Sequence, residues 1–280
     1  MSLIDLILNL AGLMIWAEWR SGNRKKGMRV PAQMLVATLQ RAEPSRKGWL
    51  WPASLVALVV IRGLFYKQIG SGVGWSPSIP LGAISLTFRS DWAGKILLFS
   101  FLSFLASLGA FYASLLFLSG INQKVTDSSP QQRWVRAHLG RIARWPLTVR
   151  LLLPWMTLTG LWFVLTPLTS RLDLIPRPDT FGFALQSAMV VGLGGYLVWK
   201  YLIAGILLLY ILNSYVYMGG STFWNYINLS TQTLIRPVSF LPLRAGKFDF
   251  APALVMVVVF LASHGMERGL TGLYGRLPLF

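Results

Sequence analysis

Hydrophobic residues in this 280-residue chain occur in long runs that are separated by shorter polar stretches. A membrane helix needs about 20 predominantly apolar residues to cross a hydrocarbon core of about 30 Å, so runs of this kind predict membrane spans. The sequence therefore predicts an all-α polytopic membrane protein with about six transmembrane helices. The expected spans are residues 1–17, 49–66, 96–118, 146–168, 201–218 and 252–264.

The first run leaves two interpretations open. Residues 1–17 are near the minimum length for a crossing, so a re-entrant or interfacial helix is the alternative to a span. Asp5 lies in this run and no basic residue precedes Arg20, whereas a signal peptide carries positive charge ahead of its apolar core. We therefore expect an uncleaved segment with its N-terminus outside.

The apolar stretch at residues 181–218 is too long for one perpendicular span, and Lys200 lies inside it. We place Lys200 toward the outer headgroups and begin the main span at Tyr201. Residues 181–199 are then either an interfacial helix or an outward extension of one tilted helix. The glycines at positions 192, 194 and 195 in this segment are typical of a helix-packing patch.

Residues 67–95 form an outer loop that is rich in glycine and proline. Ile84, Leu86 and Phe88 alternate with polar residues, a pattern that predicts a short strand or hairpin. This loop either docks a partner or covers the helix ends. Just before it, Arg62 falls near the outer end of its span, where snorkelling to the headgroups and a transport role both explain a basic side chain.

Composition and charge exclude an ordinary soluble domain. The chain is 54% hydrophobic and 12% charged, against about 25% charged residues in a typical globular domain. Its net charge is +17, and 16 of its 26 basic residues fall in predicted cytoplasmic loops. This positive-inside pattern predicts a multi-pass protein of the bacterial inner membrane with both termini outside. We expect anionic lipid headgroups as partners of the basic loops, and no nucleic acid.

The sequence offers little catalytic chemistry. It contains no cysteine, its only histidines, His138 and His264, are predicted on opposite faces, and no span carries paired carboxylates. It also lacks a phosphate-binding glycine loop or a nucleophile beside a base. We expect no metal, no cofactor and no enzymatic activity.

A stretch near the C-terminus describes a chain that leaves one membrane helix, lies along the headgroups and turns back. Leu234, Ile235, Val238 and Leu241 have the one-sided spacing of a helix lying flat in the interface. Asp249 precedes Pro252, so its carboxylate is placed to cap the free N–H groups of the last helix. A partner-binding role for Asp249 is the alternative.

Seven residues of this elbow follow one another in a distinctive order: Asn228, Arg236, Pro237, Pro242, Gly246, Asp249 and Pro252. Their order resembles the signature of the YggT (YlmG-like) family, small integral membrane proteins of bacteria with relatives in chloroplasts. The resemblance covers roughly the last quarter of the chain. It implies a role in division, envelope organisation or, in plastids, cytochrome maturation, and alternatively in osmotic and ion tolerance.

A degenerate copy of this motif stands 106 residues earlier, which predicts a duplicated unit. Chance coincidence in a chain rich in glycine and proline is the alternative. Ala143 stands where Asp249 stands, so only the second copy keeps the acidic residue. The first copy consists of Asn122, Gly140, Arg144 and Pro146, with Val149 aligned to Val255. The predicted organisation is a segment pair at 1–66, the loop at 67–95, repeats at 96–168 and 181–266, and a tail at 267–280.

Two functions follow from this organisation. The first is a non-catalytic scaffold, assembly factor or accessory subunit that packs against other membrane protein subunits. The second is an ion or small-solute channel or transporter. Against the second, the two copies appear in the same orientation and no polar residues recur at mid-span.

Overall fold

The computed structural model describes residues 3–25, 49–73, 76–88, 92–123, 129–176, 178, 180–216, 220–240, 244–245 and 248–277. Three motif positions, Leu241, Pro242 and Gly246, lie outside the described residues, as does most of the basic stretch at 18–48. The chain divides into two units. Unit 1 comprises residues 1–79 and 87–108, and unit 2 comprises residues 80–86 and 109–280.

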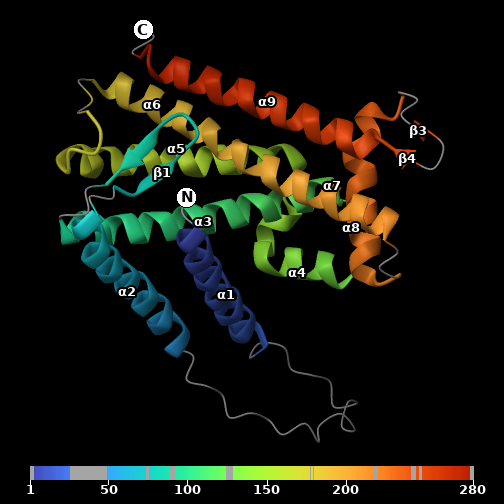
Figure 1. Cartoon of the computed structure of the whole chain (residues 1–280), viewed down its shortest axis with the longest axis horizontal. Coiled ribbons are helices and arrows are strands. Elements are labelled where there is room, and N and C mark those ends of the chain that lie inside the picture. The colour runs from blue at the N-terminus through green and yellow to red at the C-terminus, as the bar shows by residue number, and fades with distance from the viewer. Residues whose placement is uncertain are drawn as a thin grey trace, which may run out of the picture. The chain divides into compact units, whose positions relative to one another are not determined.

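Unit 1 is built from α1 (Leu3–Lys25), α2 (Leu50–Val73) and the first part of α3 (Ala93–Ile121). Helices α1 and α2 pack against each other (Figure 1). The hairpin predicted in the loop at 67–95 is confirmed, because β1 (Ser78–Pro80) and β2 (Ser85–Thr87) form a two-stranded sheet, whose turn belongs to unit 2. Gly82 in the turn between them has a φ of 82°, a conformation that favours glycine.

Unit 2 contains the remaining helices. Helix α5 packs along α6, and α9 runs beside α6 and α7 (Figure 1). Apolar side chains form two small cores, one around Val190 and Leu270 and one around Leu115 and Val135. The helical elements are α4 (Pro130–Leu139), η2 (Gly140–Arg144), α5 (Leu147–Arg171), α6 (Phe181–Gly194), η3 (Gly195–Val198), α7 (Trp199–Tyr215), α8 (Thr222–Ile235), η4 (Arg236–Val238) and α9 (Ala251–Tyr274).

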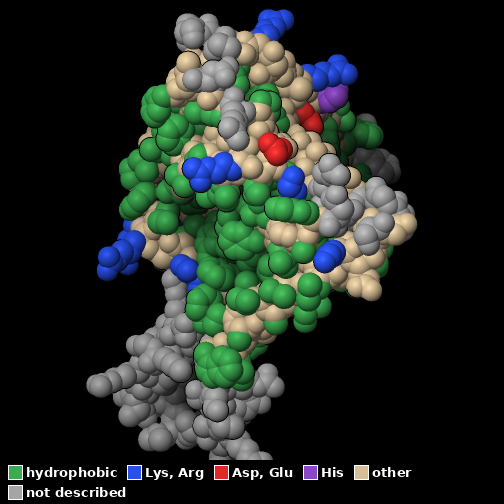
Figure 2. All heavy atoms as spheres, turned by 90° about the vertical axis from the view of Figure 1, so that its left-hand side faces the viewer, with side chains coloured by type: hydrophobic (Ala, Val, Ile, Leu, Met, Phe, Trp, Pro, Cys, Tyr) green, Lys and Arg blue, Asp and Glu red, His purple; other side chains and the backbone are tan. Residues whose placement is uncertain are grey.

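Five helical segments in the described part of the chain are long and apolar enough to cross a membrane. The protein is therefore a helical, multi-pass membrane protein. Large apolar side chains are exposed along these segments, and Figure 2 shows one face on which hydrophobic groups cover wide areas between scattered basic ones. The segments are Leu50–Gly70, Ala93–Ile121, Leu147–Arg171, Phe181–Tyr215 and Ala251–Tyr274.

Two expected spans differ from these segments. The first hydrophobic run forms α1, but α1 is not among the five, and its C-terminal half carries Glu18 and Arg20. Residues 181–215 form one helical segment, because Gly195 and Val198 at the joins keep right-handed helical backbone angles. Of the two alternatives for residues 181–199, the structure therefore shows the extension of one helix.

Glycines in α6 allow close approach of neighbouring backbone, as the helix-packing interpretation predicted. A Cβ on Gly192 would overlap Thr159 Oγ1 and stand 3.1 Å from the carbonyl oxygen of Trp155 on α5. A Cβ on Gly194 would overlap the carbonyl oxygen of Leu81 and stand 3.3 Å from the Cα of Gly82. The small residues in α6 thus admit both α5 and the hairpin loop.

The connection between α8 and α9 contains a feature that the sequence analysis missed. Strands β3 (Arg244–Ala245) and β4 (Phe248–Asp249) pair in antiparallel fashion, with Arg244 opposite Asp249. The expected one-sided helix ends at Ile235 and continues as the single turn η4. In the described part its apolar residues are covered as expected, since Leu234, Ile235 and Val238 are half-buried.

Candidate functional site

A buried ion pair lies inside unit 1. Arg62 on α2 is only 2% exposed, and its Nη2 atom donates a hydrogen bond of 2.8 Å to Oδ1 of Asp5 on α1. Asp5 is likewise buried, at 3% exposure. The snorkelling interpretation of Arg62 is therefore wrong. The guanidinium points into the packed unit, where it binds the Asp5 carboxylate on the neighbouring helix.

Three further polar side chains complete this site, which we call the Arg62 cluster (Asp5, Asn9, Arg62, Tyr66 and Ser103). Arg62 Nη1 donates to Asn9 Oδ1 at 2.7 Å, and Nη2 also donates to Ser103 Oγ at 2.9 Å. Asn9 Nδ2 donates to the same Ser103 Oγ at 3.1 Å, and the Tyr66 hydroxyl donates to Asp5 Oδ1 at 2.7 Å. The cluster joins α1, α2 and α3 through side chains alone.

Aromatic rings add to the stabilisation of this cation. The guanidinium carbon of Arg62 lies 5.5 Å from the centre of the Tyr66 ring and 5.4 Å from that of Phe99. Distances within about 6 Å permit cation–π attraction. The Nε atom of Arg62 is buried and has no hydrogen-bond partner among the described residues. The cluster as a whole is neutral, which suits an apolar environment.

A second buried polar site, without charges, lies in unit 2; we call it the Asn122 cluster (Asn122, Gln132, Tyr226 and Ser230). Asn122 Nδ2 donates to Ser230 Oγ at 2.8 Å, and Gln132 Nε2 donates to the Asn122 carbonyl oxygen at 3.4 Å. The Tyr226 hydroxyl donates to Gln132 Oε1 at 3.4 Å. Burial raises the pKa of Tyr226, although its bond to Asn122 opposes this, so the hydroxyl stays protonated at neutral pH. The cluster ties the end of α3 to α4 and α8.

The two motif copies agree in part. Pro146 is the N-cap of α5 and Pro252 lies in the first turn of α9, so each proline stands at the start of a long helix. The asparagines are not equivalent, because Asn122 follows the end of α3 whereas Asn228 lies inside α8. Gly140 ends α4 with a φ of 61°.

The acidic motif residue occupies its expected place. Asp249 Oδ1 accepts a hydrogen bond of 3.0 Å from the backbone N–H of Ala251, the first residue of α9. At the matching point of the first copy, where Ala143 stands, α5 begins without a side-chain cap. The remaining motif residues Arg144, Arg236 and Pro237 are exposed at the ends of short helices.

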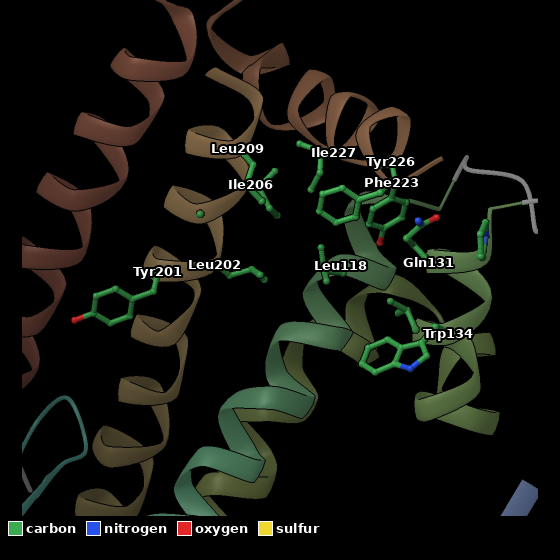
Figure 3. A pocket seen from close by; sticks show the side chains of 13 residues that line it. Leu118, Gln131, Trp134, Tyr201, Leu202, Ile206, Leu209, Phe223, Tyr226 and Ile227 are labelled. Carbon is green, nitrogen blue, oxygen red and sulfur yellow. The ribbon is translucent and has the colours of Figure 1, made fainter. Parts of the chain in front are cut away.

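An apolar groove of about 580 Å³ lies between α3, α4, α7 and α8 in unit 2; we call it the α7 groove. Figure 3 shows α7 on one side and Gln131, Trp134 and Phe223 on the other. Tyr226 belongs to both the groove wall and the Asn122 cluster. The sequence analysis did not find this groove, since its walls come from four helices. Its lining on α7 consists of Tyr201, Leu202, Gly205, Ile206 and Leu209.

The described residues show no group of three His, Asp or Glu side chains close enough to hold a metal ion. His138 packs against the Trp134 ring at 4.1 Å between ring centres and is buried in α4. Comparison with known proteins finds no matching family model, no similar curated protein and no similar solved structure. The resemblance to the YggT family thus remains an expectation drawn from its motif residues.

Proposed function

We propose that the protein is a non-catalytic membrane scaffold, assembly factor or accessory subunit of a larger membrane complex. The observation that supports this best is the use of its buried polar groups. In the Arg62 cluster a cation and a carboxylate bind each other and three neutral side chains, one from each of three helices. In the Asn122 cluster neutral groups do the same. In both sites the buried polar groups bind one another and pack this chain's own helices, which supports a non-catalytic, structural role.

The proposed topology has six crossings, with α1 as the sixth, in a bacterial inner membrane and with both termini outside. The short helices α4 and α8 would then lie as elbows on the cytoplasmic face, one in each of two repeats of the YggT type. The order of long helix, short helix and long helix occurs twice, as α3–α4–α5 and α7–α8–α9, which supports the duplication. Four arginines and no acidic residue on α4 and η2 support contact with anionic headgroups.

The chain's lack of cysteine provides a direct test of this topology. Single cysteines at the exposed positions Arg141 and Arg276 would be labelled with a membrane-impermeant maleimide. We expect Arg276→Cys to react in cells whose outer membrane alone is opened, and Arg141→Cys to react only after the inner membrane is permeabilised. Labelling of both from the same side would contradict the proposed topology.

The scaffold function is tested by purification from native membranes in a mild detergent. We expect other membrane subunits to co-purify in constant stoichiometry. The purified chain alone, reconstituted into liposomes, should pass no more ions than empty liposomes. A chain that purifies alone and conducts ions would refute the scaffold proposal.

One observation favours a channel or transporter as the second candidate. Ionisable residues within membrane helices often mark ion pathways, and Arg62 lies in the candidate span Leu50–Gly70 with its Nε atom unpaired. If this candidate is correct, liposomes should show a flux that Arg62→Gln reduces. Arg276→Gln, at an exposed position outside the candidate spans, serves as the control.

A further inference from the structure

The α7 groove has the shape of a narrow slot that suits one apolar acyl chain. Its α7 lining recurs at Tyr201, Gly205 and Leu209, so it follows a single helix face. The eight steps from Tyr201 to Leu209, at about 1.5 Å each, give the face a length of about 12 Å. Because α3 and α7 are both candidate membrane helices, the occupant must be compatible with hydrocarbon.

The size of the groove suits a small molecule or a single acyl chain. The groove holds about 580 Å³, within the range of about 300–1,000 Å³ typical of small-molecule sites. The space beside Gly205 is open, because a Cβ added there would meet no atom within 4 Å.

The α4 side of the groove offers polar and positive groups. Gln131 lines the groove, and its Oε1 atom is buried without a hydrogen-bond partner in the described part of the chain. Arg133 is exposed one helical turn from the lining residue Pro130. Helix α4 carries two arginines, Arg133 and Arg136, and no acidic residue. A headgroup that combines a negative charge with a hydroxyl donor complements this side.

We propose that the α7 groove binds a phospholipid with an anionic, hydroxyl-bearing headgroup, such as phosphatidylglycerol. One acyl chain lies along α7, the headgroup hydroxyl donates to Gln131, and the phosphate lies near Arg133. This proposal rests on the proposed membrane placement of α4 and deepens the lipid contact that belongs to it. It does not require a protein partner.

The test uses the full chain in nanodiscs of equal parts phosphatidylglycerol and phosphatidylcholine. After extraction into detergent, native mass spectrometry counts the lipids that each chain retains. We expect one phosphatidylglycerol per wild-type chain and its loss in Gly205→Phe, whose side chain fills the groove. Gly160→Phe is the matched control, because Gly160 lies exposed on α5 and a Cβ there also meets no atom within 4 Å.

Selectivity is tested separately from occupancy. Arg133→Gln should retain a lipid but lower the preference for phosphatidylglycerol about fivefold, the effect of one basic side chain near an anionic surface. Arg276 is exposed and lies far from the groove residues in the sequence, so Arg276→Gln should leave the preference unchanged. Folding is checked by thermal unfolding of each delipidated variant: added phosphatidylglycerol should raise the Tm of wild type and Gly160→Phe, and not that of Gly205→Phe.

Three outcomes would overturn the proposal: no lipid retained by wild type, equal retention by Gly205→Phe and Gly160→Phe, or a polypeptide in the groove in place of lipid. Failure here is distinguishable from failure of the scaffold proposal. Gly205→Phe should still co-purify with the wild-type set of membrane subunits even where lipid retention is lost.

Discussion

The two units solve the problem of joining apolar helices in different ways. Unit 1 uses an ion pair, Asp5 with Arg62, surrounded by neutral groups that satisfy most of its hydrogen bonds. Unit 2 uses neutral hydrogen bonds in the Asn122 cluster and close backbone contact at Gly194. The apolar α7 groove stays open beside the neutral cluster.

This difference teaches where the protein is most vulnerable. A buried ion pair contributes little net stability when intact, but removal of one partner leaves a charge stranded in an apolar interior. A neutral cluster loses only a share of its hydrogen bonds when one member is removed. Removing one charged partner from the Arg62 cluster should therefore be more disruptive than removing one member of the Asn122 cluster.

The largest effect is expected for Asp5→Ala. This variant leaves the Arg62 guanidinium buried without its carboxylate, so the free energy of unfolding should fall by about 3–5 kcal/mol. The measurement is a titration from mild detergent to dodecyl sulfate, followed by circular dichroism. The double variant Asp5→Leu, Arg62→Met removes both charges and should recover most of the loss.

Glu267→Ala provides the partly exposed counterpart to this experiment. The Lys200–Glu267 pair is 3.5 Å long and partly solvated, so its removal should cost about 0–1 kcal/mol. A loss in Asp5→Ala no larger than in Glu267→Ala would mean that the Arg62 cluster does not hold unit 1 together.

The next effect concerns close packing in unit 2. Gly194→Ala places a Cβ against the fixed backbone oxygen of Leu81, which should destabilise the protein by about 1–3 kcal/mol in the same titration. Gly160→Ala introduces the same methyl group where no atom lies within 4 Å, and it should leave stability unchanged or raise it slightly. Equal responses would mean that the contact of α6 with the hairpin loop is not close.

The neutral cluster should respond more weakly. Asn122→Ala removes the hydrogen bond to Ser230, whose hydroxyl still donates to the Tyr226 carbonyl oxygen at 2.8 Å. No donor of Ser230 is left stranded, so the expected loss is about 0.5–1.5 kcal/mol. Thr233→Ala on the exposed side of α8 is the control and should lie within about 0.5 kcal/mol of wild type. A loss as large as that of Asp5→Ala would erase the contrast between the two clusters.

The smallest effect is expected at the start of α9. Asp249→Asn keeps an oxygen that can accept from Ala251 N but loses the negative charge near the helix N-terminus. The expected loss is about 0.3–1 kcal/mol, with membrane insertion intact. Co-purification of partners is measured alongside. Unchanged stability with loss of a partner would assign Asp249 to partner binding.

The long helices could be predicted because length and hydrophobicity are local properties of the sequence. The strand around Ile84, Leu86 and Phe88 was equally accessible, since strand alternation is local too. The position of Asp249 before Pro252 indicated the cap for the same reason: the contact spans two residues.

The Arg62 cluster could not be predicted in the same way. Asp5 and Arg62 are 57 residues apart, and only the rotation of α1 against α2 decides whether they meet. The available signal was an acidic residue in one apolar run and a basic residue in another, but each residue was interpreted without the other. The α7 groove was inaccessible for a related reason, because four helices line it. The asparagine correspondence, based on spacing alone, failed to anticipate that Asn228 lies inside α8.

The continuous helical segment Phe181–Tyr215 has a consequence for the surrounding membrane. Its 35 residues at 1.5 Å each extend about 52 Å, more than the roughly 40–45 Å of a bilayer with its headgroups. The segment must therefore lean, project into water or bend at the tighter turn η3, and each response depends on bilayer thickness. A thinner or thicker membrane would thus change the tilt of this helical segment. The packing of every helix that contacts it would change as well.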